Sequence, residues 1–173
     1  MSVSTTRTPC TISLESMFSG LHTASPRKTV SLKPFCTAVL EHLEEPEAAI
    51  GEMFRILADG GYLIMTAPLF WHLHDEPRDF YRYTKHGLRY LLEKNGFEIV
   101  ELLPLTGFCV TFGQELVYFL WLLRGGGRLN PLWWIVPPLG ALIQSCCYML
   151  NKIDPSTSFT WMYLVVGRKP CGP

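Results

Sequence analysis

The chain alternates between short, nearly continuous apolar runs and stretches in which apolar residues recur every three to four positions. The apolar run KPFCTAVL (33–40) predicts a buried strand, and the nearly continuous run GYLIMTAP (61–68) predicts a strand buried on both faces, because such a strand has no polar side. The segment FEIVELLPL (97–105) predicts another strand. Between these runs, apolar residues recur every three to four positions, which predicts helices over about 46–58 and 84–95. A last run, FTWMYLVVGRKP (159–170), is rich in aromatic and β-branched residues and predicts a terminal strand.

Local signals mark the ends of the two helices. Pro46 suits a first helical turn, where its missing N–H is no loss, and Gly60 accepts the left-handed conformation that ends a helix. Thr84 is a candidate N-cap, and Gly96 closes the second helix. The order strand, helix, strand, helix, strand predicts an α/β fold whose parallel strands are joined by right-handed crossovers.

Two apolar segments separated by a glycine-rich turn lie before the last strand (113–152). The second, Pro131 to Leu150, is as long as a membrane span, but Pro137 and Pro138 predict a break and hence a pair of shorter helices. We expect these helices not to cross a bilayer. They either cover the sheet or lie in a membrane interface over 116–150, and both readings stay open. Aromatic residues at helical spacing are predicted to belong to the core: Phe108, Phe112, Tyr118 and Phe119.

Composition and charge narrow the class of protein. Hydrophobic residues make up 48% of the 173 residues and charged residues 17%, which is typical of a globular chain. The 15 basic and 15 acidic residues cancel, so no basic footprint for nucleic acid exists. Residues 1–32 are rich in Ser and Thr and predict a poorly ordered arm. The six cysteines form no Cys-x-x-Cys pair, and no secretory signal precedes them, which indicates a cytoplasmic protein.

The richest chemistry lies in the connection LFWHLHDEPRDFYRYT, residues 69–84, which fits neither a helical nor a strand period. It follows the end of one predicted strand, and Glu41 and His42 follow the end of the strand before it. Ligands of open parallel sheets bind outside the carboxyl ends of the strands. We therefore expect both segments to face one crevice.

The segments AVLEHLEEPEAAIGEMFRILADGGYLIMTAP and HDEPRDFYRYTKHGLRYLLEKNGFEIVEL resemble class I S-adenosylmethionine-dependent methyltransferases of the methyltransferase type 11 kind. The spacing of V-L-E-H and R-x-L-x-x-G-G carries the resemblance, which runs from about Cys36 to Pro170. It implies a partial Rossmann-like sheet, mostly parallel, with residues 33–170 as the C-terminal half-domain. It also implies an antiparallel last strand beside 97–103 and a helical insertion before it.

The resemblance also implies a reaction, namely methyl transfer from S-adenosylmethionine to a small or lipid-like acceptor. Leu40 and Glu41 would then lie beside the donor, while Glu41, His42 and Tyr81 act on the reacting groups. The substrate-binding candidates are His74, Arg78, Asp79 and Tyr83.

Each of these roles has a plainer structural alternative. Glu41 and His42 could serve only as polar contacts at a helix entry, and Asp79 with Arg82 could merely hold the loop. A metal cluster of His72, His74 and their acidic neighbours matches no defined spacing, and transfer from a sulfonium needs no metal, so no metal site is predicted.

What precedes Lys33 departs from the family. The methyltransferase donor site includes a glycine-rich turn after the first strand and an acid after the second, and no G-x-G occurs before Lys33. We therefore expect impaired activity and weak donor binding, as in a truncated enzyme. Two alternatives are a non-catalytic remnant and a membrane-surface interaction protein built on Leu116 to Leu150.

Overall fold

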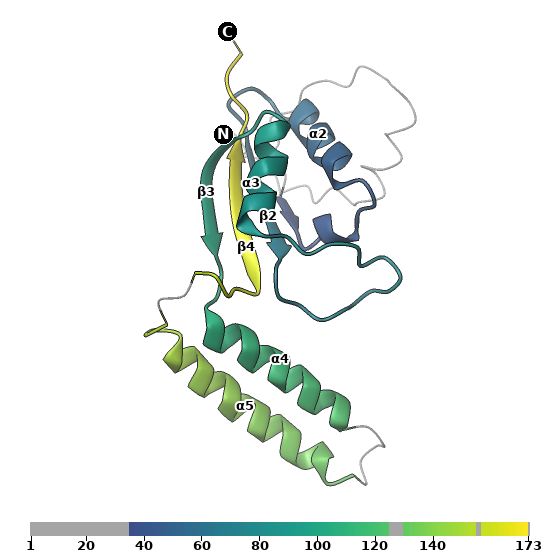
Figure 1. Ribbon diagram of the computed structural model, residues 1–173, viewed down its shortest axis with the longest axis vertical. Helices are drawn as coiled ribbons and strands as arrows, with labels where there is room; N and C mark the ends of the chain where they lie inside the picture. The colour runs from purple at the N-terminus through teal and green to yellow at the C-terminus, as the bar shows by residue number, and fades with distance from the viewer. Residues whose placement is uncertain (1–34, 125–129, 155–156, 173) are drawn as a thin grey trace, which may run out of the picture.

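The computed structural model describes residues 35–124, 130–154 and 157–172, so the predicted arm 1–32 lies outside the described residues. Its centre is a four-stranded sheet in the order β1-β2-β4-β3. The strands are Phe35–Thr37 (β1), Tyr62–Pro68 (β2), Glu98–Pro104 (β3) and Met162–Arg168 (β4). All four apolar runs that predicted strands contain one (Figure 1).

The last strand inserts between two strands that run the opposite way. β1 pairs with β2 in parallel, whereas β4 pairs antiparallel with both β2 and β3. Val165, for example, lies opposite Met65 on one side and Leu102 on the other. This confirms the predicted α/β sheet, mostly parallel with an antiparallel last strand.

The first strand ends earlier than its apolar run predicted. β1 stops at Thr37, and Ala38 has φ +49°, a left-handed backbone that turns the chain out of the sheet. A short 3-10 helix, η1 (Leu40–His42), follows instead of the end of the strand. Glu41 and His42 therefore lie on a helical turn just beyond the sheet.

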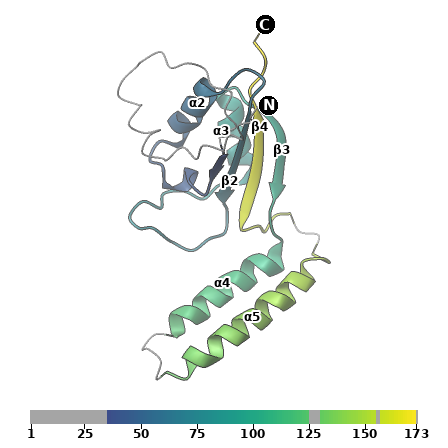
Figure 2. The ribbon, with the colours of Figure 1, turned by 180° about the vertical axis from the view of Figure 1, so that it is seen from behind.

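Two amphipathic helices cover one face of the sheet (Figures 1 and 2). α2 (Pro46–Ile56) begins with Pro46 in its first turn, and α3 (Lys85–Lys94) is capped by Thr84, whose Oγ1 accepts a hydrogen bond from the Gly87 N–H at 3.0 Å. Their apolar sides pack against the sheet to form the core. Its fully buried members include Ile50, Leu57, Leu63, Met65, Leu88, Leu92 and Val165.

The insertion before β4 is a helical hairpin of α4 (Phe108–Leu123) and α5 (Leu132–Leu150). The prediction of a break at Pro137 and Pro138 is wrong, because α5 runs through both. Proline fixes φ near the helical value, so it removes hydrogen bonds without forbidding the helix. The two helices approach closely where a Cβ on Gly113 would overlap the Cys147 side chain.

The hairpin does not cover the sheet. Figure 1 shows it beyond the end of the sheet at which β2 and β3 terminate, with both helices leading away from the core. The interpretation of α4 and α5 as a helical cover is therefore wrong. Within the described residues, α5 is long and apolar enough to cross a membrane by length and composition, and only 11% of that window is buried.

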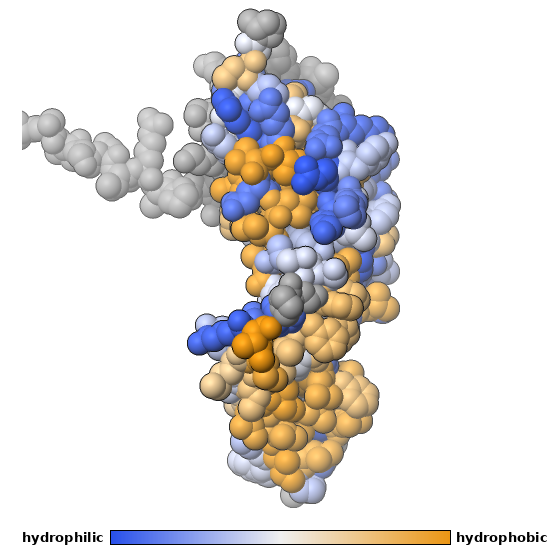
Figure 3. Space-filling view, turned by 60° about the vertical axis from the view of Figure 1, so that its left-hand side comes forward, coloured by the Kyte–Doolittle hydropathy of each residue, from blue (hydrophilic) through white to orange (hydrophobic). Residues whose placement is uncertain are grey.

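The hairpin surface is apolar on the face shown in Figure 3. The prediction that its aromatic residues form the core is wrong, because Phe108, Phe112, Tyr118 and Phe119 are 38–55% exposed. A helical period alone shows which residues share a face, and it does not show that another element covers that face. Other exposed apolar side chains of the hairpin include Leu122, Trp134, Ile135, Leu142 and Met149.

Candidate active site

The connection 69–84 lies against η1, as expected for two segments that follow neighbouring strand ends. The backbone N–H groups of Phe80 and Tyr81 both donate to the Glu41 carbonyl oxygen, at 2.9 and 3.2 Å. At the end of the connection, the Tyr83 N–H donates to the Pro68 carbonyl at 2.8 Å. These bonds tie the loop to both strand ends and bring Glu41, His42 and His74 together.

Arg82 holds the loop in this shape. Its guanidinium donates to both carboxylate oxygens of Asp79, at 2.5 and 2.7 Å, and also to the carbonyls of Trp71 and His72, at 3.1 and 3.0 Å. The Asp79 side chain is 1% exposed, and its hydrogen bonds with Arg82 lower the pKa of the carboxyl group. The structural alternative foreseen for this pair therefore describes its contacts well.

Glu41 is fully buried, and within the described residues neither of its carboxylate oxygens has a hydrogen-bond partner. Burial raises its pKa, although the nearby His42, His74 and Arg82 oppose that effect. A buried carboxylate without partners is costly in an apolar environment. Such a group is available for chemistry that a hydrogen-bonded carboxylate would not perform.

Two histidines face this carboxylate. The Nε2 atom of His42 lies 4.0 Å from Oε1 of Glu41. The Nδ1 atom of His42 lies 2.6 Å from the Arg78 carbonyl oxygen. Since a carbonyl can only accept, His42 carries a proton on Nδ1 and leaves a lone pair on Nε2 when it is neutral. The His42 and His74 rings meet edge to face with centroids 4.8 Å apart.

The remaining predicted site residues divide by exposure. Arg78 is exposed and Tyr81 is 40% exposed, with its hydroxyl donating to the Glu44 carbonyl at 3.2 Å. Tyr83 is buried, and its hydroxyl donates to the Leu40 carbonyl at 3.0 Å. Arg78 and Tyr81 can thus meet a ligand from solvent, whereas Tyr83 and Leu40 engage each other inside the fold.

A second link, which the sequence did not indicate, joins the loop to the hairpin. Nδ1 of His72 lies 3.4 Å from Oε2 of Glu115, and its ring lies 4.5 Å from that of Tyr118. Trp71 stacks on Trp161, with the ring centroids 4.8 Å apart. No local spacing could have revealed these contacts, because the partners belong to α4 and to the segment before β4.

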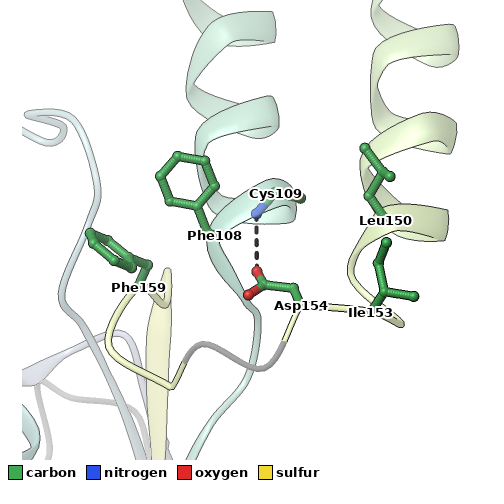
Figure 4. A pocket seen from close by; sticks show the side chains of 6 residues that line it. All are labelled: Phe108, Cys109, Leu150, Ile153, Asp154 and Phe159. Atoms are coloured by element: carbon green, nitrogen blue, oxygen red, sulfur yellow. Dashed lines mark hydrogen bonds between the residues drawn. The ribbon is translucent and has the colours of Figure 1, made fainter.

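A pocket of about 370 Å³, whose lining does not include Glu41, lies at the base of the hairpin (Figure 4). Its lining is mostly apolar and consists of Phe108, Cys109, Leu150, Ile153, Asp154 and Phe159. Figure 4 shows the Asp154 carboxylate accepting a hydrogen bond from the Cys109 N–H, at 3.4 Å. The pocket is thus suited to an apolar group more than to a charged one.

Comparison with known proteins gives one family and a set of similar folds. A family model described as a methyltransferase domain matches residues 34–65, which include β1, η1 and α2. No curated protein matches the chain.

Among solved structures, the cyclase SpnF is similar, with 20% identity, a TM-score of 0.51, and coverage of 86% of this chain and 54% of SpnF. A complex between a Haloferax volcanii methyltransferase activator and the protein assigned there as a methyltransferase gives 14% identity and a TM-score of 0.50. That match covers 86% of this chain and 58% of the other. A phosphoethanolamine N-methyltransferase of Haemonchus contortus, in complex with S-adenosyl-L-methionine, is less similar, with 13% identity, a TM-score of 0.43, and coverage of 79% and 32%.

The chain spans little more than half the length of the first two of these structures. At such identities the likeness shows a shared fold. The matched segment is similar to a methyltransferase domain, and the shared fold agrees with the resemblance that the sequence indicated.

Proposed function

We propose that this chain carries the acceptor side of an S-adenosylmethionine-dependent methyltransferase site that acts on a small or lipid-like acceptor. The observation that carries the proposal is the fully buried carboxylate of Glu41, which accepts no hydrogen bond from the described residues and lies beside His42, beneath the loop 69–84. Methyl transfer to an oxygen or nitrogen acceptor needs a base near the acceptor, and this pair offers one.

The donor would supply an electrophilic methyl group on its sulfonium. Nε2 of His42, left with a lone pair by the contact of Nδ1 with the Arg78 carbonyl, would accept the acceptor's proton. Glu41, whose Oε1 lies 4.0 Å from that Nε2 atom, would stabilise the resulting imidazolium when its carboxyl group is ionised. The exposed Arg78 and Tyr81, together with His74, would orient the acceptor, while Asp79 and Tyr83 keep the loop in place.

Donor contacts within the described residues are few. The resemblance implies that Leu40 and Glu41 would lie beside the donor, but none of the described strands ends in a glycine-rich turn that could cradle the donor's carboxylate. We therefore expect weak donor binding by this chain. Isothermal titration with S-adenosylmethionine measures it, and micromolar affinity would mean that a donor site exists elsewhere in the chain.

The function itself is tested by methyl transfer from radiolabelled S-adenosylmethionine, at millimolar concentration, to an organic extract of small molecules and lipids. We expect slow transfer that His42→Ala and Glu41→Gln abolish. His86→Ala is the matched control, because His86 is exposed on α3, outside the site. Transfer that persists in both site variants would show that Glu41 and His42 do not carry the reaction, and its absence from the unchanged chain would favour the non-catalytic alternative.

A second proposal concerns where the reaction takes place. The exposed apolar hairpin and the apolar pocket at its base support peripheral contact of 116–150 with a membrane. At the tip, the Arg124 guanidinium lies 3.9 Å from the Trp121 ring centroid and 3.7 Å from that of Trp133, a combination suited to a lipid headgroup region. The protein would then be cytoplasmic and bound to a membrane surface, with a lipid-like acceptor within reach.

A further inference from the structure

Glu41, His42 and His74, which the proposed methyl transfer assigns to the acceptor side, also form a cluster with the composition of a metal site. Their ligand-type atoms all lie within 4.8 Å of one another, although His74 is distant from the other two in sequence. Glu41 and His42 come from η1 and His74 comes from the loop after β2. The fold therefore assembles one carboxylate and two imidazoles at one place beside the sheet.

The carboxylate of this cluster has no hydrogen-bond partner among the described residues. Glu41 is 0% exposed and, within the part of the chain that the structure describes, neither of its oxygens accepts a hydrogen bond. Buried charges are normally paired or bound to a metal, because desolvation otherwise makes them costly. A cation bound at Glu41 would remove that cost.

Both histidines are oriented as metal ligands usually are. Nδ1 of His42 is held by the Arg78 carbonyl at 2.6 Å, and Nδ1 of His74 lies 3.3 Å from Oδ2 of Asp79. With the proton on Nδ1, each neutral ring keeps its lone pair on Nε2. A histidine that binds a metal commonly donates its other N–H to a carbonyl or carboxylate in this way, which fixes the ring and its tautomer.

From this geometry we propose that Glu41, His42 and His74 bind a divalent transition metal ion, with Zn²⁺ as the reference ion. One carboxylate and two imidazoles are a common set of three protein ligands for zinc, and they leave a position open for water or a small ligand. Ligand atoms around tetrahedral zinc are roughly 3.4 Å apart, as follows from its bond lengths of about 2.0–2.2 Å. The side chains would close by about 1 Å on binding the ion. Metal binding requires neither the donor nor an acceptor, but an ion on Nε2 of His42 would occupy the lone pair that the proposed methyl transfer uses, so the two would be alternative uses of one cluster.

The test is direct metal binding by the full chain, purified with chelator and then freed of it. Isothermal titration with Zn²⁺ should show one strong site, and Co²⁺ should give visible absorption bands without the near-ultraviolet bands of thiolate ligands. His42→Ala, His74→Ala and Glu41→Gln should each weaken Zn²⁺ binding at least tenfold. His86→Ala should leave it unchanged.

A melting experiment keeps the test decisive if one variant folds poorly. Zn²⁺ should raise the melting temperature of the unchanged chain and of His86→Ala, but not that of Glu41→Gln, which retains the shape of the glutamate side chain. The proposal is overturned if Zn²⁺ fails to bind, if thiolate bands appear with Co²⁺, or if Glu41→Gln and His74→Ala bind as the unchanged chain does. None of these measurements depends on methyl transfer.

Discussion

The Arg82 guanidinium binds both oxygens of the buried Asp79 carboxylate, and the same carboxylate accepts a hydrogen bond from the backbone N–H of His74 at 3.0 Å. The pair therefore fixes the position of His74 as well as the shape of the loop. Because two parallel hydrogen bonds join the guanidinium to the buried carboxylate, we expect this ion pair to contribute more to the free energy of unfolding than an ordinary surface pair does.

Replacement of Asp79 by Asn should lower the free energy of unfolding by roughly 1.5–3 kcal/mol, the usual contribution of hydrogen bonds to a charged group. The folded pKa of Asp79 lies below its unfolded value, so this stabilisation is present above about pH 4 and is lost as pH falls toward the folded pKa. Urea unfolding at pH 7 and at acid pH measures it. Asp59→Asn is the control, because the Asp59 side chain is 61% exposed, and a similar loss there would contradict the prediction.

Glu41 has the opposite pH dependence. Its folded pKa lies above its unfolded value, so the folded state is favoured while the group is protonated, and this advantage is lost as pH rises through the folded pKa. In chelator, Glu41→Gln should therefore raise the free energy of unfolding at pH 8 by roughly 1–3 kcal/mol, the cost of an unsatisfied buried group.

Melting curves of both proteins between acid and pH 8 check this prediction, and the difference should close as pH falls toward the ordinary glutamate pKa of about 4.3. Glu44→Gln is the matched control on the exposed neighbouring glutamate and should change little. A gain that is equal at every pH would point to packing and not to charge.

The sequence predicted most of the sheet but only part of the site. The runs that became β2, β3 and β4 carry a strong apolar signal, and Thr84 and Pro46 mark helix starts by local chemistry that needs no tertiary contact. The early end of β1 at Ala38 was not predictable, because nothing in an alanine signals a positive φ.

At the site, the sequence identified the strand ends but not the distances between side chains. The approach of His74 to Glu41 depends on Arg82 binding the carbonyls of Trp71 and His72, and backbone acceptors leave no trace in a sequence pattern. The same limitation applies to the hairpin. The apolar pattern of α4 and α5 predicted two helices. Whether those helices pack against the sheet or remain exposed depends on the whole fold, which the pattern does not contain.

Tyr83 offers a test of how firmly the loop is attached to η1. Its buried hydroxyl donates to the Leu40 carbonyl at 3.0 Å, so Tyr83→Phe should lower the free energy of unfolding by roughly 0.5–1.5 kcal/mol. Tyr90→Phe removes a hydroxyl from a residue that is 61% exposed on α3 and should have almost no effect. Urea unfolding of the two variants measures the difference. Equal effects would mean that the hydrogen bond of Tyr83 contributes nothing to the free energy of unfolding.

The last prediction concerns the hairpin and a membrane. If α4 and α5 lie in the interface, the chain should float with lipid vesicles in a density gradient and should be released by a carbonate wash, since a peripheral helix pair is not anchored across the bilayer. Leu122→Glu should weaken vesicle binding about tenfold or more, because Leu122 is 79% exposed and burial of a leucine side chain contributes roughly 1.5–3 kcal/mol.

Val100→Glu is the matched control for this experiment, since Val100 is 56% exposed but lies on β3, outside the hairpin. It should leave vesicle binding unchanged. Equal losses in the two variants would show that general hydrophobicity drives the association. Retention of the chain in the membrane through the carbonate wash would show instead that α5, which is long enough by composition, crosses the bilayer. Because the hairpin lies beyond the end of the sheet that carries Glu41, binding through it would bring the candidate site close to the lipid surface.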